Sequence, residues 1–232
     1  MRFYPLVWIL AISVAVSTNL IASEPVKLNE PLADYTKQRQ SEFDQIPVSR
    51  RSELAELADQ VRDAIAAGGQ VNLHFICTHN SRRSHLAQIW ATVAAADRGI
   101  EGVNTFSGGT EATAMNVRIV AALGRAGFDV ATAASDVPNP RYDVRYSHAA
   151  SPIVCFSKVY DQSPNPSAGY CAVMVCSDAD ANCPVVRGAA TRLVIKYVDP
   201  KESDGTPQES DTYDERCAQV AREMLYAFSL LS

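Results

Sequence analysis

The chain has 232 residues, of which 47% are hydrophobic and 20% are charged. This balance is typical of a globular protein and excludes a disordered or fibrous chain. The formal net charge is -5 and the pI is near 5.4, so nothing indicates the basic face that binds nucleic acid. We expect one domain with a sizeable core, no nucleic-acid partner, and at most a local basic pocket for an anion.

The first residues have the layout of a secretory signal. Arg2 precedes a nearly continuous apolar run from Leu6 to Val16, and the small residues Ala22 and Ser23 suit a cleavage site. The run is shorter than the ~20 apolar residues of a spanning helix. We predict a signal peptide over residues 1–23 and a periplasmic domain; the alternative is an uncleaved inner-membrane anchor, with no other membrane contact.

The next segments predict a lead-in followed by a folded domain. Residues 24–49 are polar and contain three prolines, so we expect a linker or extended lead-in. Residues 54–65 carry apolar side chains at helical spacing, and Gly68 and Gly69 end that helix. We therefore place the domain at residues 50–232, beginning with an N-terminal helix.

Strands and helices alternate through the rest of the chain. Apolar patterns predict strands at 71–76, 103–106, 172–175 and 192–197, and helices after Arg83, at 116–127, and from a cap at Thr206. The alternation predicts an α/β three-layer sandwich with a central four-stranded parallel sheet. Residues 129–170 do not fit the alternation; 142–146 and 153–157 predict an added β-hairpin.

A Cys-X5-Arg loop, CTHNSRRS from Cys77 to Ser84, lies between the first of these strands and a helix. Backbone N–H groups and the helix dipole converge there on an anion of phosphate size. They and the neighbouring arginines stabilise a thiolate at Cys77. Arg83 offers the planar fork that holds two oxygens of an oxyanion. Ser84 can donate to the thiolate, and Asn80 can brace the loop.

Three further residues follow strand ends, where the ligands of parallel sheets bind. Cys176 and Cys183 lie at opposite ends of a polar, helix-compatible segment and could join if it partly unwinds. A static disulfide is the alternative. Asp199, fixed by Pro200, can protonate a leaving oxygen. No set of ligands has the spacing of a zinc site, and we expect neither metal nor cofactor.

The motifs CTHNSRRS, CSDADANCP, VDP and DGTPQE resemble the thioredoxin-coupled arsenate reductases, which share their fold with low-molecular-weight protein tyrosine phosphatases. The resemblance covers residue 71 to the C-terminus. It implies that Cys77 attacks arsenate, that Asp199 assists the leaving oxygen, and that Cys176 and then Cys183 complete a disulfide relay. A thioredoxin-like protein would reduce the resulting disulfide. The predicted oxyanion-binding residues are Thr78, His79, Asn80, Ser81, Arg82 and Arg83.

The chain departs from the family pattern at His79, where glycine is usual; a side chain there would either narrow the loop or force an uncommon backbone angle. Arg82 adds charge that a nearby carboxylate could neutralise. A phosphomonoesterase using Cys77 and Asp199 is the second interpretation, although Lys201 and Glu202 stand where a tyrosine phosphatase would have aromatic residues. A non-catalytic anion-binding or thiol-sensing protein is the third.

The remaining cysteines and histidines predict structural roles. Cys217 lies on the apolar stripe of the last helix and should be core. Cys155 and Cys171 could pair across the added hairpin. His74, in the first strand, and His85, in the helix after the loop, are expected to be packed or solvated and not catalytic.

Overall fold

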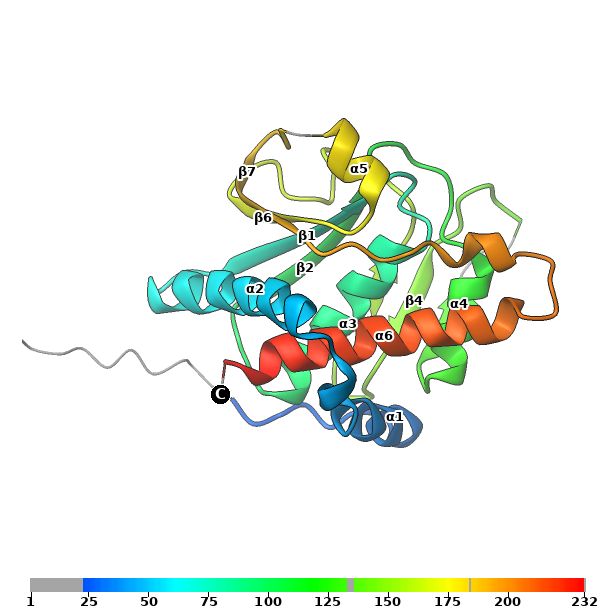
Figure 1. The fold of residues 1–232 in the computed structure, drawn as a ribbon, viewed down its shortest axis with the longest axis horizontal. Coiled ribbons are helices and arrows are strands. Elements are labelled where there is room, and N and C mark those ends of the chain that lie inside the picture. Colours follow the sequence, from blue (N-terminus) through cyan, green and yellow to red (C-terminus); the bar gives the residue numbers. More distant parts are fainter. Residues whose placement is uncertain (1–22, 133–135, 184, 232) are drawn as a thin grey trace, which may run out of the picture.

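The computed structural model describes residues 23–132, 136–183 and 185–231. Its centre is a four-stranded parallel sheet in the order β2-β1-β6-β7 (Figure 1). These strands are β1 (Val71–Cys77), β2 (Val103–Gly109), β6 (Tyr170–Met174) and β7 (Ala189–Val194). The inner strands β1 and β6 are buried along almost their whole length, as expected for a parallel sheet that is covered on both faces. The predicted α/β sandwich is confirmed.

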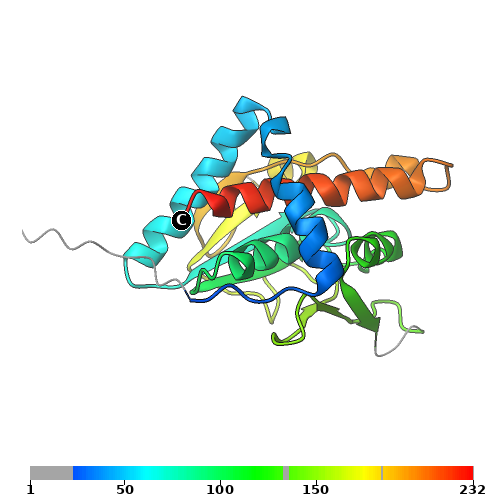
Figure 2. The ribbon, with the colours of Figure 1, turned by 90° about the horizontal axis from the view of Figure 1, so that it is seen from below.

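Helices α2 (Val48–Ala66) and α3 (Arg83–Asp97) pack on this sheet, and α6 (Glu209–Ser229) packs on both of them (Figures 1 and 2). α4 (Val117–Arg125) contacts α6, and the short α5 (Ser177–Asn182) contacts β1 and β6. α3 is buried on nearly every side because it lies between the sheet and α6. The described chain also contains two 3-10 turns, η1 (Phe43–Gln45) and η2 (Pro200–Ser203).

The lead-in predicted over residues 24–49 is wrong in its local structure, because it contains the helix α1 (Glu30–Gln40). Figure 2 shows α1 lying across α6, which it contacts. Its side chain Leu32 is fully buried, and the ring of Tyr35 stacks on Trp90 with centroids 5.6 Å apart. Only a narrow stripe of α1 is buried against the core, so most of its residues are polar. Its overall composition therefore resembles that of a linker. Pro31 occupies the first turn, where its missing N–H has no cost.

The last helix begins later than its sequence signals predict. α6 starts at Glu209, with Gln208 in the cap position and no side-chain cap bond, so Thr206 is not its cap. The Glu209 carboxylate instead accepts from the Gly205 N–H at 2.5 Å and pairs with Arg118 at 2.8 Å. The carboxylate therefore holds the turn before α6 and ties it to α4.

The added segment is a three-stranded antiparallel sheet in the order β3-β4-β5: β3 (Asp129–Thr132), β4 (Tyr142–Arg145) and β5 (Ile153–Cys155). The β4–β5 pair is the predicted hairpin, and β3 is a third strand that the sequence did not indicate. After β5 the chain makes a parallel bridge between Gly109 and Val159 at the end of β2. This bridge brings residues 156–160 beside the carboxyl end of the central sheet.

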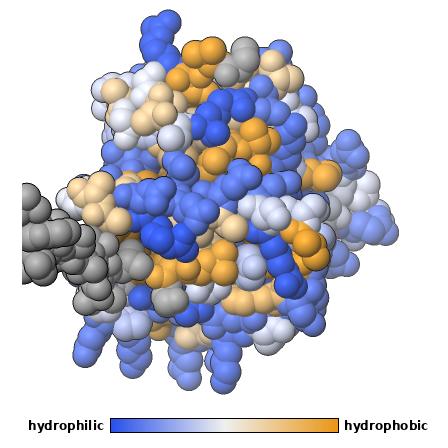
Figure 3. All heavy atoms as spheres, turned by 60° about the vertical axis from the view of Figure 1, so that its left-hand side comes forward, coloured by the Kyte–Doolittle hydropathy of each residue, from blue (hydrophilic) through white to orange (hydrophobic). Residues whose placement is uncertain are grey.

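The predicted signal peptide, residues 1–23, lies outside the described residues except for Ser23. Within the described ranges, no helix combines the length and the apolarity needed to cross a bilayer. On the face drawn in Figure 3, apolar side chains form small patches between polar ones.

Candidate active site

The Cys-X5-Arg segment connects β1 directly to α3: Cys77 ends the strand and Arg83 begins the helix. We call residues 77–83, which the sequence predicts to bind an oxyanion, the oxyanion loop. Its tight path depends on Asn80, which adopts a left-handed φ of 44° and is the only non-glycine residue with positive φ in the described chain. Asparagine tolerates this conformation better than most residues. Of the two effects expected at His79, the uncommon backbone angle does not occur there and belongs to its neighbour.

Several carbonyl groups of the loop accept hydrogen bonds from residues outside it. Those of Cys77 and Thr78 accept from the N–H groups of Thr110 and Glu111 at 3.1 and 2.9 Å, and that of Ser81 accepts from the Asn116 N–H at 2.9 Å. In contrast, the N–H groups of residues 78–82 have no acceptor among the described residues. A row of unpaired N–H groups at a helix N-terminus forms a concave nest for an anion.

A hydrogen-bond chain controls the thiol at the base of this nest. Cys77 is 3% exposed, and its Sγ lies 3.1 Å from the Oγ of Ser84. The Asn80 side-chain N–H donates to the same Oγ at 2.8 Å. Because Ser84 Oγ accepts from Asn80, its own hydrogen is free to point at the sulfur. Ser84, the predicted donor, thus contacts Cys77, and Asn80, the predicted brace, orients Ser84.

Arg83 and Asp199 meet beside the nest. The Arg83 Nη2 lies 2.8 Å from Asp199 Oδ2, and its Nη1 donates to the Tyr197 carbonyl at 3.3 Å. Asp199 caps η2 by accepting from the Lys201 N–H at 3.1 Å. Residues 83 and 199 come together because the carboxyl ends of parallel strands share one edge of the sheet. The pair places a guanidinium group and a carboxyl group side by side next to the loop.

The side chain of Arg82 extends past Asp199 towards α6, and its Nε lies 3.8 Å from Asp199 Oδ1. Its Nε donates to the Tyr213 hydroxyl at 2.8 Å, and its Nη2 lies 3.1 Å from Asp204 Oδ2. Tyr213 donates in turn to Asp204 at 2.7 Å. Arg82 therefore anchors the loop to α6, and the carboxylate of Asp204 offsets its charge. The Arg82 side chain is therefore engaged by Tyr213, Asp204 and Asp199, and its backbone N–H is the group left without an acceptor in the described chain.

Three other loop side chains also point away from the nest. His79 Nε2 pairs with Glu111 Oε1 at 2.9 Å, and the His79 side chain is 45% exposed. Ser81 Oγ donates to the Ala114 carbonyl at 2.7 Å. Thr78 Oγ1 lies 3.5 Å from the Sγ of Cys176. The structure thus leaves the backbone of these residues, and not their side chains, available to an anion.

The added segment braces the loop, a contribution that the sequence did not reveal. Ser157 Oγ donates to the His79 carbonyl at 2.9 Å, and the Lys158 N–H donates to Asn80 Oδ1 at 2.9 Å. Asn139 holds Ser157 through two bonds to its backbone, at 2.7 and 3.1 Å. These residues lie about 60 to 80 positions from the loop, and no motif marks them. They fix Asn80, on which the Cys77 thiol network depends.

Cys176 and Cys183 flank α5 at the adjacent strand end. Cys176 is fully buried, and its Sγ caps α5 by accepting from the Ala179 N–H at 3.3 Å. Its contact with Thr78 places it next to the oxyanion loop. Cys183 ends the helix and is partly exposed. Both are free thiols. Among the described residues, no cluster of His, Cys, Asp or Glu could hold a metal ion.

Two curated proteins are similar to this chain in sequence over most of their own length. The arsenate reductase of Bacillus licheniformis is 27% identical over 157 residues, which are 68% of this chain and 94% of that protein. Arsenate reductase 1 of Staphylococcus epidermidis is 30% identical over 132 residues, which are 57% of this chain and 80% of that protein. The chain belongs to the arsenate reductase family. No protein-family model matches the sequence of this family member.

Solved structures resemble this arsenate reductase homologue only weakly. A low-molecular-weight phosphotyrosine phosphatase from Vibrio cholerae O395 is 15% identical, covers 68% of this chain and 94% of its own, and has a TM-score of 0.44. A thioredoxin-dependent arsenate reductase of Corynebacterium glutamicum is 16% identical, covers 87% of this chain and 98% of its own, and has a TM-score of 0.40. The family assignment therefore rests on the sequence relatives.

The other three cysteines of this arsenate reductase homologue are buried in the core. Trp90 donates to the Cys217 Sγ at 3.4 Å, as a core role predicts. Burial raises the pKa of Cys155 to about 12 and also raises the pKa of Cys171. The suggested Cys155–Cys171 disulfide is absent, because both thiols are free and lie on different sheets. None of the three has the acidic thiol that redox chemistry needs.

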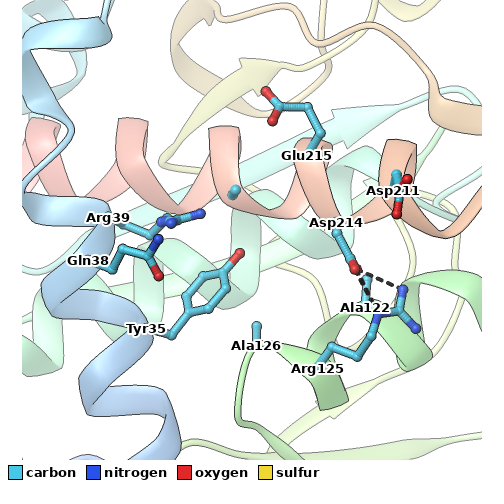
Figure 4. A pocket seen from close by; sticks show the side chains of 10 residues that line it. Tyr35, Gln38, Arg39, Ala122, Arg125, Ala126, Asp211, Asp214 and Glu215 are labelled. Atoms are coloured by element: carbon cyan, nitrogen blue, oxygen red, sulfur yellow. Dashed lines mark hydrogen bonds and ion pairs between the residues drawn. The ribbon is translucent and has the colours of Figure 1, made fainter.

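A separate pocket lies between α1, α4 and α6 (Figure 4). Its volume is about 370 Å³, and Tyr35, Arg39, Arg125 and Asp214 contribute to its lining. Arg125 and Asp214 pair within it at 2.7 Å. None of its lining residues belongs to the oxyanion loop. We therefore place the candidate site of the family member at the oxyanion loop and not at this pocket.

Two buried histidines of this family member predict its response to acid. His74 and His85 are fully buried, and neither ring nitrogen of His74 has a partner in the described chain. Desolvation, helped by the charge of Lys158, lowers the pKa of each to about 3. Unfolded histidine titrates near 6.5, so the unfolded state gains protons below that pH while the folded state does not. Their stabilising contribution is complete above pH 6.5 and is lost towards pH 3.

We expect the free energy of unfolding to fall by roughly 2 kcal/mol per histidine between pH 7.5 and pH 5. Urea titrations at both pH values measure this loss. His74→Leu should remove about half of the contribution of the buried histidines, since His85 then remains as the second of the two. An identical pH dependence in the variant and the wild type would contradict the assignment.

Proposed function

We propose that this arsenate reductase family member reduces arsenate through a three-thiol relay. Arsenate occupies the N–H nest, with Arg83 on its oxygens. The Cys77 thiolate bonds to arsenic, and Asp199 protonates the oxygen that leaves as water. The observation that carries the proposal is the row of N–H groups without acceptors in the loop that directly follows the Cys77 thiol. It supplies an oxyanion site and a nucleophile at one point.

The electrons come from the other two thiols. Cys176 attacks the sulfur of Cys77. The electron pair of the S–As bond passes to arsenic, and arsenite leaves. Cys183 then attacks the sulfur of Cys176 and releases the Cys77 thiolate. The sum is one arsenate and two thiols converted to one arsenite, one Cys176–Cys183 disulfide and one water. Support comes from the contact of Cys176 with Thr78, beside the nucleophile. A thioredoxin-like dithiol completes the cycle by reducing the disulfide.

Phosphomonoester hydrolysis is the second candidate, favoured by the Arg83–Asp199 pair alone. A phosphocysteine at Cys77 would need Asp199 as acid and then as base, with no part for Cys176 or Cys183. The oxyanion ligands are common to the two reactions. Only the thiols beside the loop distinguish them.

We also propose the setting in which the enzyme works. Residues 1–23 would direct export to the periplasm, or anchor the chain there, and the folded chain from α1 onward would form the catalytic domain. The reductant would then be a thioredoxin-like protein outside the cytoplasm. A cell-fractionation blot with the wild-type chain tests the location.

The proposed function is tested by running two assays on the full-length chain. Arsenite release is measured with thioredoxin, thioredoxin reductase and NADPH, and aryl phosphate hydrolysis is measured without them. We expect sustained arsenite formation that requires thioredoxin. Phosphate release without any arsenite would favour the phosphatase, and binding of either anion without turnover would favour a non-catalytic role.

A further inference from the structure

The helix between the two relay thiols is held by an ion-pair clamp. Asp180, in the middle of α5, pairs through Oδ1 with Arg192 of β7 at 2.5 Å and through Oδ2 with Lys196 at 2.7 Å. These two hydrogen bonds, that of Lys196 first, lower the pKa of Asp180. α5 has only six residues, too few to persist without tertiary contacts. We call Asp180, Arg192 and Lys196 the α5 clamp.

The clamp reaches the end of the helix that carries a thiol. Arg192 Nη2 also donates to the Asp180 carbonyl at 3.1 Å and to the Cys183 carbonyl at 3.4 Å. A guanidinium at these last carbonyls complements the helix dipole. At the other end, the Sγ of Cys176 is itself the cap. Both cysteines therefore take part in holding the helix in its thiol form.

A disulfide between these thiols is incompatible with an intact α5. Seven residue steps at a rise of ~1.5 Å place the two cysteines about 10 Å apart along the axis. A disulfide needs Cα atoms within ~7 Å. Its formation must unwind α5, so the Ala179–Cys176 cap is lost and the Cys183 carbonyl moves away from Arg192. Contacts that exist only in the dithiol form stabilise that form relative to the disulfide.

We propose that Asp180, acting through Arg192 and Lys196, is a positioning residue that sets the redox equilibrium of the Cys176–Cys183 pair. The inference rests on the proposed relay. The clamp keeps α5 wound while Cys176 waits beside the loop, and it makes the finished disulfide easier for a dithiol to reduce. Forming the disulfide removes two electrons and two protons from the thiols. These pass to arsenate in the proposed reaction, and to oxidised dithiothreitol in the test below.

The test is a redox titration of the full chain in dithiothreitol buffers, with the Cys176–Cys183 disulfide quantified by alkylation and peptide mass spectrometry. Asp180→Asn keeps the size of the side chain but removes its charge. We expect the equilibrium constant for disulfide formation to rise about three- to tenfold, where tenfold corresponds to a potential ~30 mV more negative. Arg192→Gln should shift it in the same direction. Asp178→Asn is the matched control, an exposed acid on the same helix, and should change it less than twofold.

The outcomes separate the two proposals. A disulfide that forms in the wild type with the same equilibrium constant in Asp180→Asn and Arg192→Gln would overturn the clamp and leave the relay standing. A wild type that forms no Cys176–Cys183 disulfide would overturn both. A role confined to general stability would lower the urea midpoint of the variants without moving the potential. Circular dichroism of each variant verifies its fold.

Discussion

Replacing Cys77 with serine is expected to abolish arsenite formation, with a loss of at least about a thousandfold in the rate constant kcat. The serine hydroxyl stays protonated and is a poor nucleophile, and an oxygen cannot form the disulfide with Cys176 that releases arsenite. The N–H nest and Arg83 do not depend on the sulfur. Arsenate or phosphate should therefore still bind, which calorimetry measures.

The control for this variant is Cys217→Ala, which removes a thiol buried against Trp90 and remote from the loop. It should keep at least about half of the wild-type rate constant, since no proposed step uses that sulfur. Aryl phosphate hydrolysis should also vanish in Cys77→Ser, because both candidate reactions begin at the same sulfur. Arsenite release by Cys77→Ser at a rate near that of the wild type would remove Cys77 from the mechanism.

The second large effect is expected at the two thiols that flank α5. With thioredoxin as the only reductant, Cys176→Ser and Cys183→Ser should each lose about a hundredfold or more in steady-state arsenite formation. Cys183→Ser should still release one arsenite per chain and then stop, because Cys176 can attack Cys77 but nothing resolves the product. Rapid-quench measurement of arsenite separates that first turnover from the steady state.

Phosphate ester hydrolysis provides the internal comparison for these two variants. It should stay within about threefold of the wild-type rate, since Cys176 and Cys183 have no part in a phosphocysteine pathway. If both variants reduced arsenate continuously at the wild-type rate, the pair would be an incidental dithiol. The phosphatase interpretation would then be the stronger one.

The sequence was sufficient to predict the oxyanion loop because its parts are contiguous. A buried strand, Cys77, a polar turn and a helix beginning at Arg83 are all local signals. Asp199 lies far away in sequence, yet the alternation of strands and helices predicted its approach, since parallel strands end at one edge. The observed Arg83–Asp199 pair at 2.8 Å agrees with that prediction.

Other features of the site and the fold depend on contacts with residues that are distant in the sequence, and no local sequence pattern predicts these contacts. Arg82 seemed suited to an oxyanion, but its direction is decided by Tyr213 and Asp204, more than a hundred residues later. Helix α1 resembled a linker because its contact with the core is one narrow stripe. The hydrogen bond from Ser157 to the His79 carbonyl likewise joins residues that are distant in the sequence. A tertiary contact fixed each of them.

The most direct test of the relay is a thiol map of Cys183→Ser after exposure to one equivalent of arsenate in the absence of reductant. Alkylation of the free thiols and peptide mass spectrometry identify the oxidised pair, while arsenite is counted in the same sample. The three-thiol relay predicts a Cys77–Cys176 disulfide and one arsenite per chain. Arsenite released with both thiols still free, or no arsenite at all from a correctly folded chain, would contradict it.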